Sequence, residues 1–261
     1  KNYGSTDMEI VRKKLSDKFM SFHIAHRGLH GEGVCENSME AFRRAIESGY
    51  GIELDVHLTK DNKLCVIHDS YLSRMTDKPG VAERLTSEEL EEYTLKDGQK
   101  IPFLPEVLKL VDGRAPLLIE LKFRRMFNEA QADELLRELE DYPYKDMVAL
   151  QSFHPLAVKY LKSHTDEYAV GYLSSYKLIK KKRSFLNYML RTLKFYRIMH
   201  ADFISYDINY LPNRYVAKKK RRGVQVLAWT VNSEEKEERA MNVADNIIFE
   251  HIDPLDTEDT E

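Results

Sequence analysis

The chain alternates between short apolar runs and longer charged segments, and this alternation restricts its fold more than any other feature. The charged segments have helical periodicity, so the order of elements is typical of βαβ units and a parallel sheet. Eight apolar, β-branched runs predict strands, at 22–25, 52–57, 117–121, 148–152, 169–173, 203–206, 224–230 and 247–249.

Helix signals lie between these runs. Cap residues such as Asn37, Ser38 and Ser233, and the helix-ending Gly49 and Gly223, predict helices at 37–47, 128–140, 155–162, 212–222 and 233–241, with a further amphipathic helix at 8–20. A single (β/α)₈ barrel needs about 250 residues, and the chain has 261. No G-x-G-x-x-G turn follows the first predicted strand, which disfavours a dinucleotide-binding fold. We predict an α/β fold, a TIM (β/α)₈ barrel.

One interval interrupts the alternation. Residues 63–67 predict an extra strand turned at Asp61-Asn62, and Thr86 with Glu89 forms a capping-box pattern. We therefore expect a small inserted subdomain after the second strand, at about 69–116, near the mouth of the barrel, where loops build active sites. The expected domains are an N-terminal helical lead-in, 1–21, and a catalytic barrel, 22–261.

Acidic residues stand at the ends of two predicted strands. Glu53 and Asp55 are two residues apart, so their side chains share one face of a strand. Glu120 has the same relation to the strand 117–121. Buried like charges repel one another, and a hard cation such as Mg²⁺ or Ca²⁺ would relieve the repulsion. The alternative is that the three acids pair with Lys122 and Arg27.

Two histidines also follow apolar runs. His26 and His68 stand at strand ends, where a histidine beside a metal can act as a general acid or base. A lone histidine is more often structural, and we interpret His23, His57, His164 and His200 in this way, while His30 and His154 stay undecided. Arg27 and Lys122 suit phosphate oxygens, the first as a bidentate donor and the second as a point charge.

Together these residues resemble the motif set of the glycerophosphodiester phosphodiesterase family. The resemblance rests on five ordered motifs, with weaker likeness at Gln151-Ser152-Phe153 and Trp229-Thr230-Val231-Asn232, and it extends from about residue 22 to 253. The five motifs are His26-Arg27-Gly28, Glu36-Asn37-Ser38, Glu53-Leu54-Asp55, His68-Asp69 and Glu120-Leu121-Lys122.

The resemblance implies hydrolysis of glycerophosphodiesters to glycerol 3-phosphate and an alcohol. It implies one divalent cation, Mg²⁺ or Ca²⁺, and a neighbouring hydroxyl that attacks the phosphorus to give a cyclic phosphate. The implied site has His26 and His68 as the catalytic pair, Glu53, Asp55 and Glu120 as metal ligands, and Arg27, Lys122, Glu36, Asn37 and Trp229 at the substrate. The chain departs from the family where the last strand usually leads to a Thr-Asp pair: Glu250-His251 stands there, and we expect this change not to touch the catalytic set.

Charge patterning leaves one alternative open. No acidic residue occurs between Tyr168 and Ala201, and the segment 174–200 interleaves lysines and arginines with aromatic residues. Such a segment is typical either of an interfacial helix on an anionic membrane or of a barrel helix with a solvated basic face. The first reading predicts a lysophospholipase D-like enzyme acting on lysophospholipids.

Two further expectations concern partners and location. The basic runs lack any helix-turn-helix or RNA-recognition signature, so we expect a small-molecule phosphodiester substrate and no nucleic acid. We expect a cytoplasmic protein with possible membrane association. The first residue is Lys1, which leaves room for a removed leader or anchor. The number of chains that assemble is left open.

Overall fold

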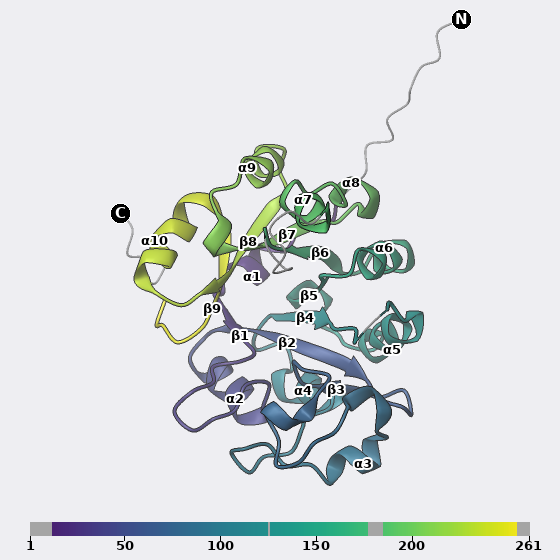
Figure 1. Ribbon diagram of the computed structural model, residues 1–261. Helices are drawn as coiled ribbons and strands as arrows, with labels where there is room; N and C mark the ends of the chain where they lie inside the picture. The colour runs from purple at the N-terminus through teal and green to yellow at the C-terminus, as the bar shows by residue number, and fades with distance from the viewer. Residues whose placement is uncertain (1–11, 125, 177–184, 255–261) are drawn as a thin grey trace, which may run out of the picture.

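A closed barrel of eight parallel strands forms the centre of the molecule in a computed structural model that describes residues 12–124, 126–176 and 185–254 (Figure 1). Each strand pairs with the next, and the last pairs with the first, Ile24 opposite Ile248. In barrel order the strands are β1 (Ile24–His26), β2 (Gly51–Leu58), β4 (Leu117–Leu121), β5 (Val148–Ser152), β6 (Ala169–Ser174), β7 (Phe203–Asp207), β8 (Gln225–Val231) and β9 (Asn246–Phe249). The predicted TIM barrel and its eight strands are confirmed.

Helices surround the barrel, and five of those described overlap ranges where the sequence predicted a helix. Ser38, Asn128 and Ser233 accept hydrogen bonds from the first turns of their helices, as the cap signals require. The ring contains α2 (Met39–Glu47), α4 (Leu104–Val111), α5 (Glu129–Leu139), α6 (Pro155–His164), α7 (Phe185–Arg191), α8 (Tyr196–Met199), α9 (Arg214–Lys220) and α10 (Glu234–Val243), with 3₁₀ turns η3 (Lys145–Met147) and η4 (Ile208–Tyr210). None of the described helices is both long and apolar enough to cross a bilayer.

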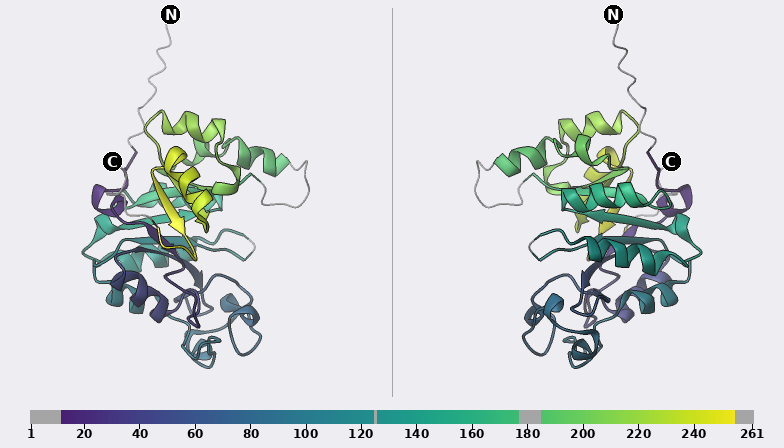
Figure 2. Two further views of the ribbon diagram at one scale, coloured as in Figure 1. Left: turned by 90° about the vertical axis from the view of Figure 1, so that its left-hand side faces the viewer. Right: turned by 90° about the vertical axis from the view of Figure 1, so that its right-hand side faces the viewer.

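The predicted inserted segment has its own small core. β3 (Leu64–Val66) turns back antiparallel to β2, and η1 (Leu72–Arg74), η2 (Ala82–Arg84) and α3 (Ser87–Glu91) follow it. The capping box at Thr86 and Glu89 is present. Side chains that include Cys65, Leu90 and Tyr93 pack together away from the barrel core, and the segment projects from one side of the molecule (Figure 2). The helix α4 also falls within 69–116 but packs against α2; the domain boundaries stay a prediction.

The N-terminal lead-in is shorter as a helix than the sequence predicted. Of the predicted helix 8–20, residues 8–11 lie outside the described residues, and only α1 (Asp17–Met20) is helical. Backbone N–H groups ahead of it bond to the barrel instead: Lys13 donates to Asp202 and Leu15 to Gln225. Tertiary hydrogen bonds therefore replace helical ones here.

The interior of the barrel has two different halves. At the amino ends of the strands the inward side chains are apolar, and Phe19 of α1 closes this end. Gly171 has no side chain because a Cβ there would lie 2.2 Å from the ring of Phe203. Toward the carboxyl ends the inward residues turn polar, for example Gln151 and Ser205, which form a buried hydrogen bond of 2.7 Å. The apolar half is the floor of the barrel and the polar half leads to its mouth.

Candidate active site

Three buried carboxylates meet at the mouth of the barrel. Glu53 and Asp55 alternate along β2, and the β2–β4 register places Asp55 directly opposite Glu120. One oxygen from each lies within 4.8 Å of the others, and each residue is at most 4% exposed. The predicted metal-binding residues are therefore brought together, and their oxygen-only donor set suits a hard cation.

The pKa values in this carboxylate cluster indicate that the neighbouring cations do not fully neutralise the negative charge of the three acids. Burial, together with repulsion from Asp55 and Glu120, raises the pKa of Glu53 well above its ordinary value. Burial raises the pKa of Glu120 to about 7 despite the nearby Lys122. Burial would also raise the pKa of Asp55, but Lys122 and Arg27 outweigh it and the net pKa is lowered. A divalent cation would supply the missing positive charge, so the residues fit the group that the sequence predicted.

The two predicted phosphate-binding cations already contact the acids. Lys122 Nζ lies 2.7 Å from Glu120 Oε1 and 3.2 Å from Asp55 Oδ1. Arg27 NH1 donates to Glu36 at 2.8 Å, and its Nε lies 3.4 Å from Asp55. The pairing that we weighed against metal binding is thus present, and it coexists with the raised pKa of Glu53.

Backbone conformation fixes the loop that carries Arg27. Arg27 has φ +57° and Gly28 has φ +77°, and the Arg27 N–H donates to Glu53 Oε2 at 3.1 Å. A Cβ on Gly28 would lie 2.9 Å from Ala41, so only glycine fits between this loop and α2. The Asn37 side chain donates to Asp55 at 2.9 Å. These contacts hold the loop against the carboxylate cluster.

His26 and His68 both stand at the mouth, each with an acid on its Nδ1. His26 Nδ1 lies 3.0 Å from Glu250, and its Nε2 lies 3.9 Å from Glu53. His68 Nδ1 lies 2.6 Å from Asp69. Because each Nδ1 is engaged by an acid, Nε2 is the nitrogen of each ring that remains for proton transfer. Burial, together with Lys122 and Arg27, lowers the pKa of His68 to about 4 against the opposing effect of Asp55.

Our expectation for Glu250 is wrong. We expected the departure at Glu250-His251 not to touch the catalytic set, yet Glu250 is the carboxylate that holds His26. It directly follows β9, and β9 pairs with β1, so closure of the barrel places it beside the end of β1. The position of Glu250 at a strand's carboxyl end, the signal used for the other acids, would have found it.

Arg74 was also missed. Its guanidinium bonds both Asp69 and Glu36, so it links the partner of His68 to the partner of Arg27. Arg74 comes from η1 in the inserted segment. No periodicity or motif spacing in the sequence pointed to it.

An apolar cavity opens beside the carboxylate cluster. Trp229 of β8 packs edge-on against Phe153, with ring centres 5.5 Å apart, and Lys122 Nζ lies 5.8 Å from the Phe153 ring. Trp229 therefore lies beside Phe153, which follows the carboxyl end of β5, and its role at the substrate stays a prediction. The cavity measures about 480 Å³, and its walls include Glu120, Lys122, Phe123, Phe153, Leu190 and Phe195.

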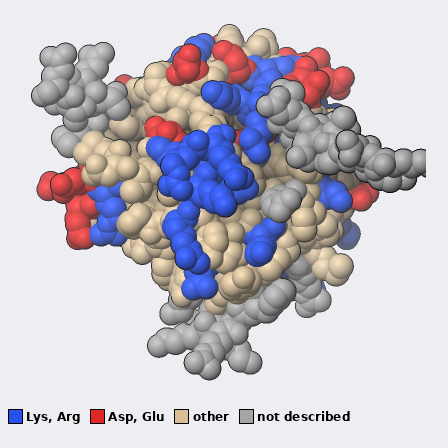
Figure 3. All heavy atoms as spheres, turned by 90° about the horizontal axis from the view of Figure 1, so that it is seen from above, with Lys and Arg blue, Asp and Glu red and all other residues tan. Residues whose placement is uncertain are grey.

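One group of the described basic residues gathers on a single face of the molecule. Residues 177–184 of the predicted basic segment 174–200 lie outside the described residues. Lysines and arginines gather instead over α9 when the molecule is seen from above (Figure 3), and Lys194, Lys218, Lys219 and Arg222 line one hollow there. Because α9 follows a barrel strand and runs back along it, its carboxyl end lies near the floor of the barrel. This group therefore does not face the mouth.

The sequence matches the glycerophosphoryl diester phosphodiesterase family over residues 26–253. A glycerophosphodiester phosphodiesterase of Caldanaerobacter subterraneus subsp. tengcongensis is 31% identical over 242 residues, which cover 89% of this chain and 95% of the relative. A mouse lysophospholipase D is 32% identical over only 49% of this chain and 45% of its own length.

Solved structures share the fold. A glycerophosphodiester phosphodiesterase from Parabacteroides distasonis has a TM-score of 0.72 and 26% identity, covering 87% of this chain and 91% of that one. An Oleispira antarctica phosphodiesterase, solved with the product sn-glycerol-3-phosphate, has a TM-score of 0.75 and 24% identity over 87% of this chain and 91% of that one. The chain therefore belongs to the glycerophosphoryl diester phosphodiesterase family of enzymes.

Proposed function

We propose that the protein is a divalent-cation-dependent phosphodiesterase that hydrolyses glycerophosphodiesters to glycerol 3-phosphate and an alcohol. The convergence of Glu53, Asp55 and Glu120 between two acid-bound histidines is the observation that carries this proposal. The names of the relatives support the same substrate class. Mg²⁺ and Ca²⁺ both suit the all-oxygen donor set.

Glu53, Asp55 and Glu120 would hold the cation, which would supply a Lewis acid for a phosphate oxygen. Arg27 and Lys122 lie at the edge of the carboxylate cluster and would hold the remaining phosphate oxygens. Their present bonds to Glu36 and Glu120 keep both side chains positioned before substrate arrives. Trp229 and Phe153 would form the apolar wall next to the phosphate.

The two histidines would divide the proton transfers. The glycerol hydroxyl next to the phosphate forms an O–P bond, and the P–O bond to the alcohol breaks. One histidine takes the proton of the attacking hydroxyl through Nε2, and the other gives a proton to the departing alcohol oxygen. Water then forms a P–O bond and gives its proton to the histidine that protonated the alcohol, while the ring P–O bond to the attacking oxygen breaks and that oxygen regains its proton from the other histidine, which gives glycerol 3-phosphate. Glu250 and Asp69 hold the rings in the tautomers that this transfer needs.

The histidine roles are tested with His26→Gln and His68→Gln on glycerophosphocholine, by measuring choline release with Mg²⁺ or Ca²⁺. Loss of general acid–base assistance is expected to lower kcat by about 10²–10⁴-fold in each variant. His164→Gln, which removes an exposed histidine of α6, is the matched control and should keep full activity. EDTA should abolish turnover of the wild type. A histidine variant with wild-type kcat, or undiminished turnover in EDTA, would contradict the assignment.

The apolar cavity favours a second candidate substrate. Phe123, Leu190 and Phe195 offer a wall that an acyl chain could cover, beside the phosphate-binding Lys122. Under this alternative the enzyme acts as a lysophospholipase D at an anionic membrane, which the basic segment 174–200 of the sequence would contact. Leu190→Ala should then lower kcat/KM for lysophosphatidylcholine without changing that for glycerophosphocholine. Equal loss on both substrates, together with no binding to anionic vesicles at low salt, would exclude it.

A further inference from the structure

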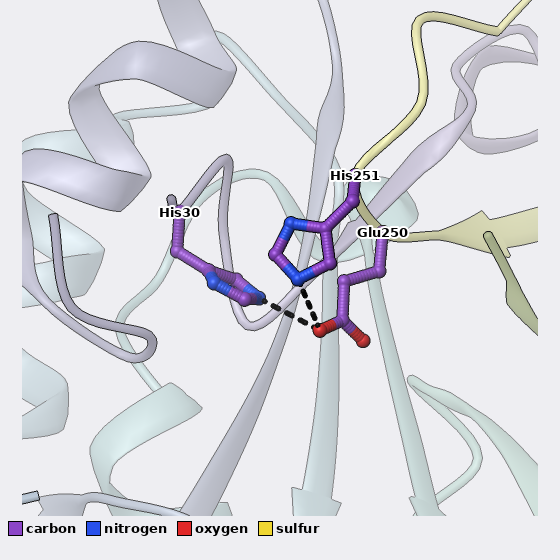
Figure 4. A group of neighbouring side chains, drawn as sticks. All are labelled: His30, Glu250 and His251. Atoms are coloured by element: carbon purple, nitrogen blue, oxygen red, sulfur yellow. Dashed lines mark ion pairs between the residues drawn. The ribbon is translucent and has the colours of Figure 1, made fainter. Parts of the chain in front are cut away.

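A second cluster of potential ligands lies at the mouth, next to the active site but separate from the carboxylate cluster. It consists of His30, Glu250 and His251, whose ligand atoms all lie within 4.8 Å of one another. Figure 4 shows both imidazole rings pointing toward the same oxygen of Glu250. His30 comes from the loop after β1, and the other two follow β9.

The distances from Glu250 to the two histidines both lie near those between the ligand atoms of a metal ion, and the shorter one is also that of an ordinary ion pair. Glu250 Oε1 lies 2.9 Å from His251 Nε2 and 3.5 Å from His30 Nε2. Ligand atoms around a tetrahedral Zn²⁺ stand about 3.3 Å apart, given bonds of about 2.0–2.1 Å. The cluster therefore needs only a small adjustment to bind such an ion.

His30 provides the second, independent observation. Its side chain is only 10% exposed, and no hydrogen bond reaches its Nε2, which points at Glu250. A buried, unsatisfied imidazole nitrogen costs free energy that a ligand would recover. The backbone holds it there, because the His30 N–H bonds to Gly28 and the next residue, Gly31, forms a tight turn with Val34.

We propose that His30, Glu250 and His251 form a site for a borderline transition-metal cation such as Zn²⁺, distinct from the hard-cation site. Two imidazoles and one carboxylate are the donors that Zn²⁺ takes, with a fourth position open to solvent through the half-exposed His251. Oxygen-seeking Mg²⁺ or Ca²⁺ would stay with the carboxylate cluster. The inference does not depend on the proposed substrate.

The site would share one ligand with the catalytic machinery. Glu250 Oε1 faces the two ligand histidines, while its Oε2 holds His26 Nδ1. The carboxylate would thus bind the ion through one oxygen and His26 through the other, in keeping with the hydrogen bonds that ligating carboxylates make to groups around a metal site. An ion in this site would lie one side chain away from the proposed acid–base pair.

The test is Zn²⁺ binding to the full chain in excess Mg²⁺, measured by isothermal titration calorimetry. One Zn²⁺ per chain is expected for the wild type. His251→Asn and His30→Gln should each weaken binding by at least about tenfold, since each removes one of three ligands. Asn suits position 251 because His251 has φ +58°.

Two controls keep the test specific. His164→Gln, which removes a histidine on the surface of α6, should leave the Zn²⁺ affinity unchanged. Glu120→Gln should also leave it unchanged, because that residue belongs only to the carboxylate cluster. Zn²⁺ binding that survives both ligand variants, that is lost in Glu120→Gln, or that is absent from the wild type would overturn the proposal. Circular dichroism shows whether each variant is folded.

Discussion

The two halves of the barrel interior are built on the same strands but differ in their inward side chains, which are apolar at the floor and charged at the mouth. At the floor, inward side chains such as Leu118 and Phe203 are apolar and fully buried. Two residues further along β4, the inward position holds Glu120, equally enclosed but with its pKa raised to about 7, mainly by burial. The floor gains stability from burial, whereas the mouth loses stability through burial of charge. The contrast shows that burying the carboxylates of the site lowers the stability of the fold when no metal is bound.

The sharpest way to break this comparison is Glu120→Gln. Removing one carboxylate should lower kcat with Mg²⁺ by on the order of 10³-fold, because the cation's charge stabilisation contributes several kcal/mol. The same variant should be at least as stable as the wild type without metal. Activity is measured with glycerophosphocholine and stability by urea unfolding in EDTA. A less stable variant with normal activity would reverse the comparison.

Phe203→Ala should show the opposite pattern. The ring fills the floor next to Gly171, and its removal leaves a cavity, so the free energy of unfolding should fall by about 3–5 kcal/mol. The kcat of the folded fraction should stay unchanged. Urea unfolding measures the loss. Ile198→Ala, at a surface side chain that is 57% exposed, is the control and should stay within about 0.5 kcal/mol of the wild type.

Glu250→Gln tests whether Glu250 contributes to the reaction by positioning His26. The amide can still accept from His26 but no longer supports a positive ring, so kcat should fall by about tenfold with KM nearly unchanged. The acid limb of the pH–rate profile should also move, which a merely structural role would not cause. Retention of the wild-type pH profile would show that Glu250 does not position His26.

The most gradual expected effect is a pH dependence of stability. The folded-state pKa of Glu120, about 7, lies above its ordinary value of 4.5, so the folded chain holds this proton more tightly than the unfolded chain. Its stability contribution is complete below about pH 4.5 and is lost as the pH rises through 7. Relative to Glu120→Gln, the metal-free wild type should lose on the order of 1–3 kcal/mol between pH 5 and pH 8. A constant difference between the two proteins across this range would contradict the raised pKa; Glu88→Gln on α3 is the matched control.

The fold could be predicted because its signals are local. Each strand run and each cap, such as Ser38 or Ser233, reports on its own segment, and eight alternations of strand and helix leave few other arrangements. The lead-in was predicted less well, because Lys13 and Leu15 bond to Asp202 and Gln225, residues about 200 positions away. The periodicity of a segment cannot predict hydrogen-bond partners that are so distant in the sequence.

The same division applies to the site. Glu53, Asp55 and Glu120 could be grouped from their places on two predicted strands, although Glu53 is the third of the eight residues of β2 and does not stand at its end. Arg74 could not, because its place depends on how the inserted segment folds back over the mouth. Glu250 was visible at a strand end, but its partner became clear only with the pairing of β9 and β1.

That pairing has a consequence for biosynthesis. The strand that carries His26 is the first of the barrel to be made and the strand that leads to Glu250 is the last, so a growing polypeptide cannot form the contact between them until the whole barrel has left the ribosome. A product of premature termination would lack the contact altogether. Full activity is thereby expected only of molecules in which the first and last strands of the barrel have paired.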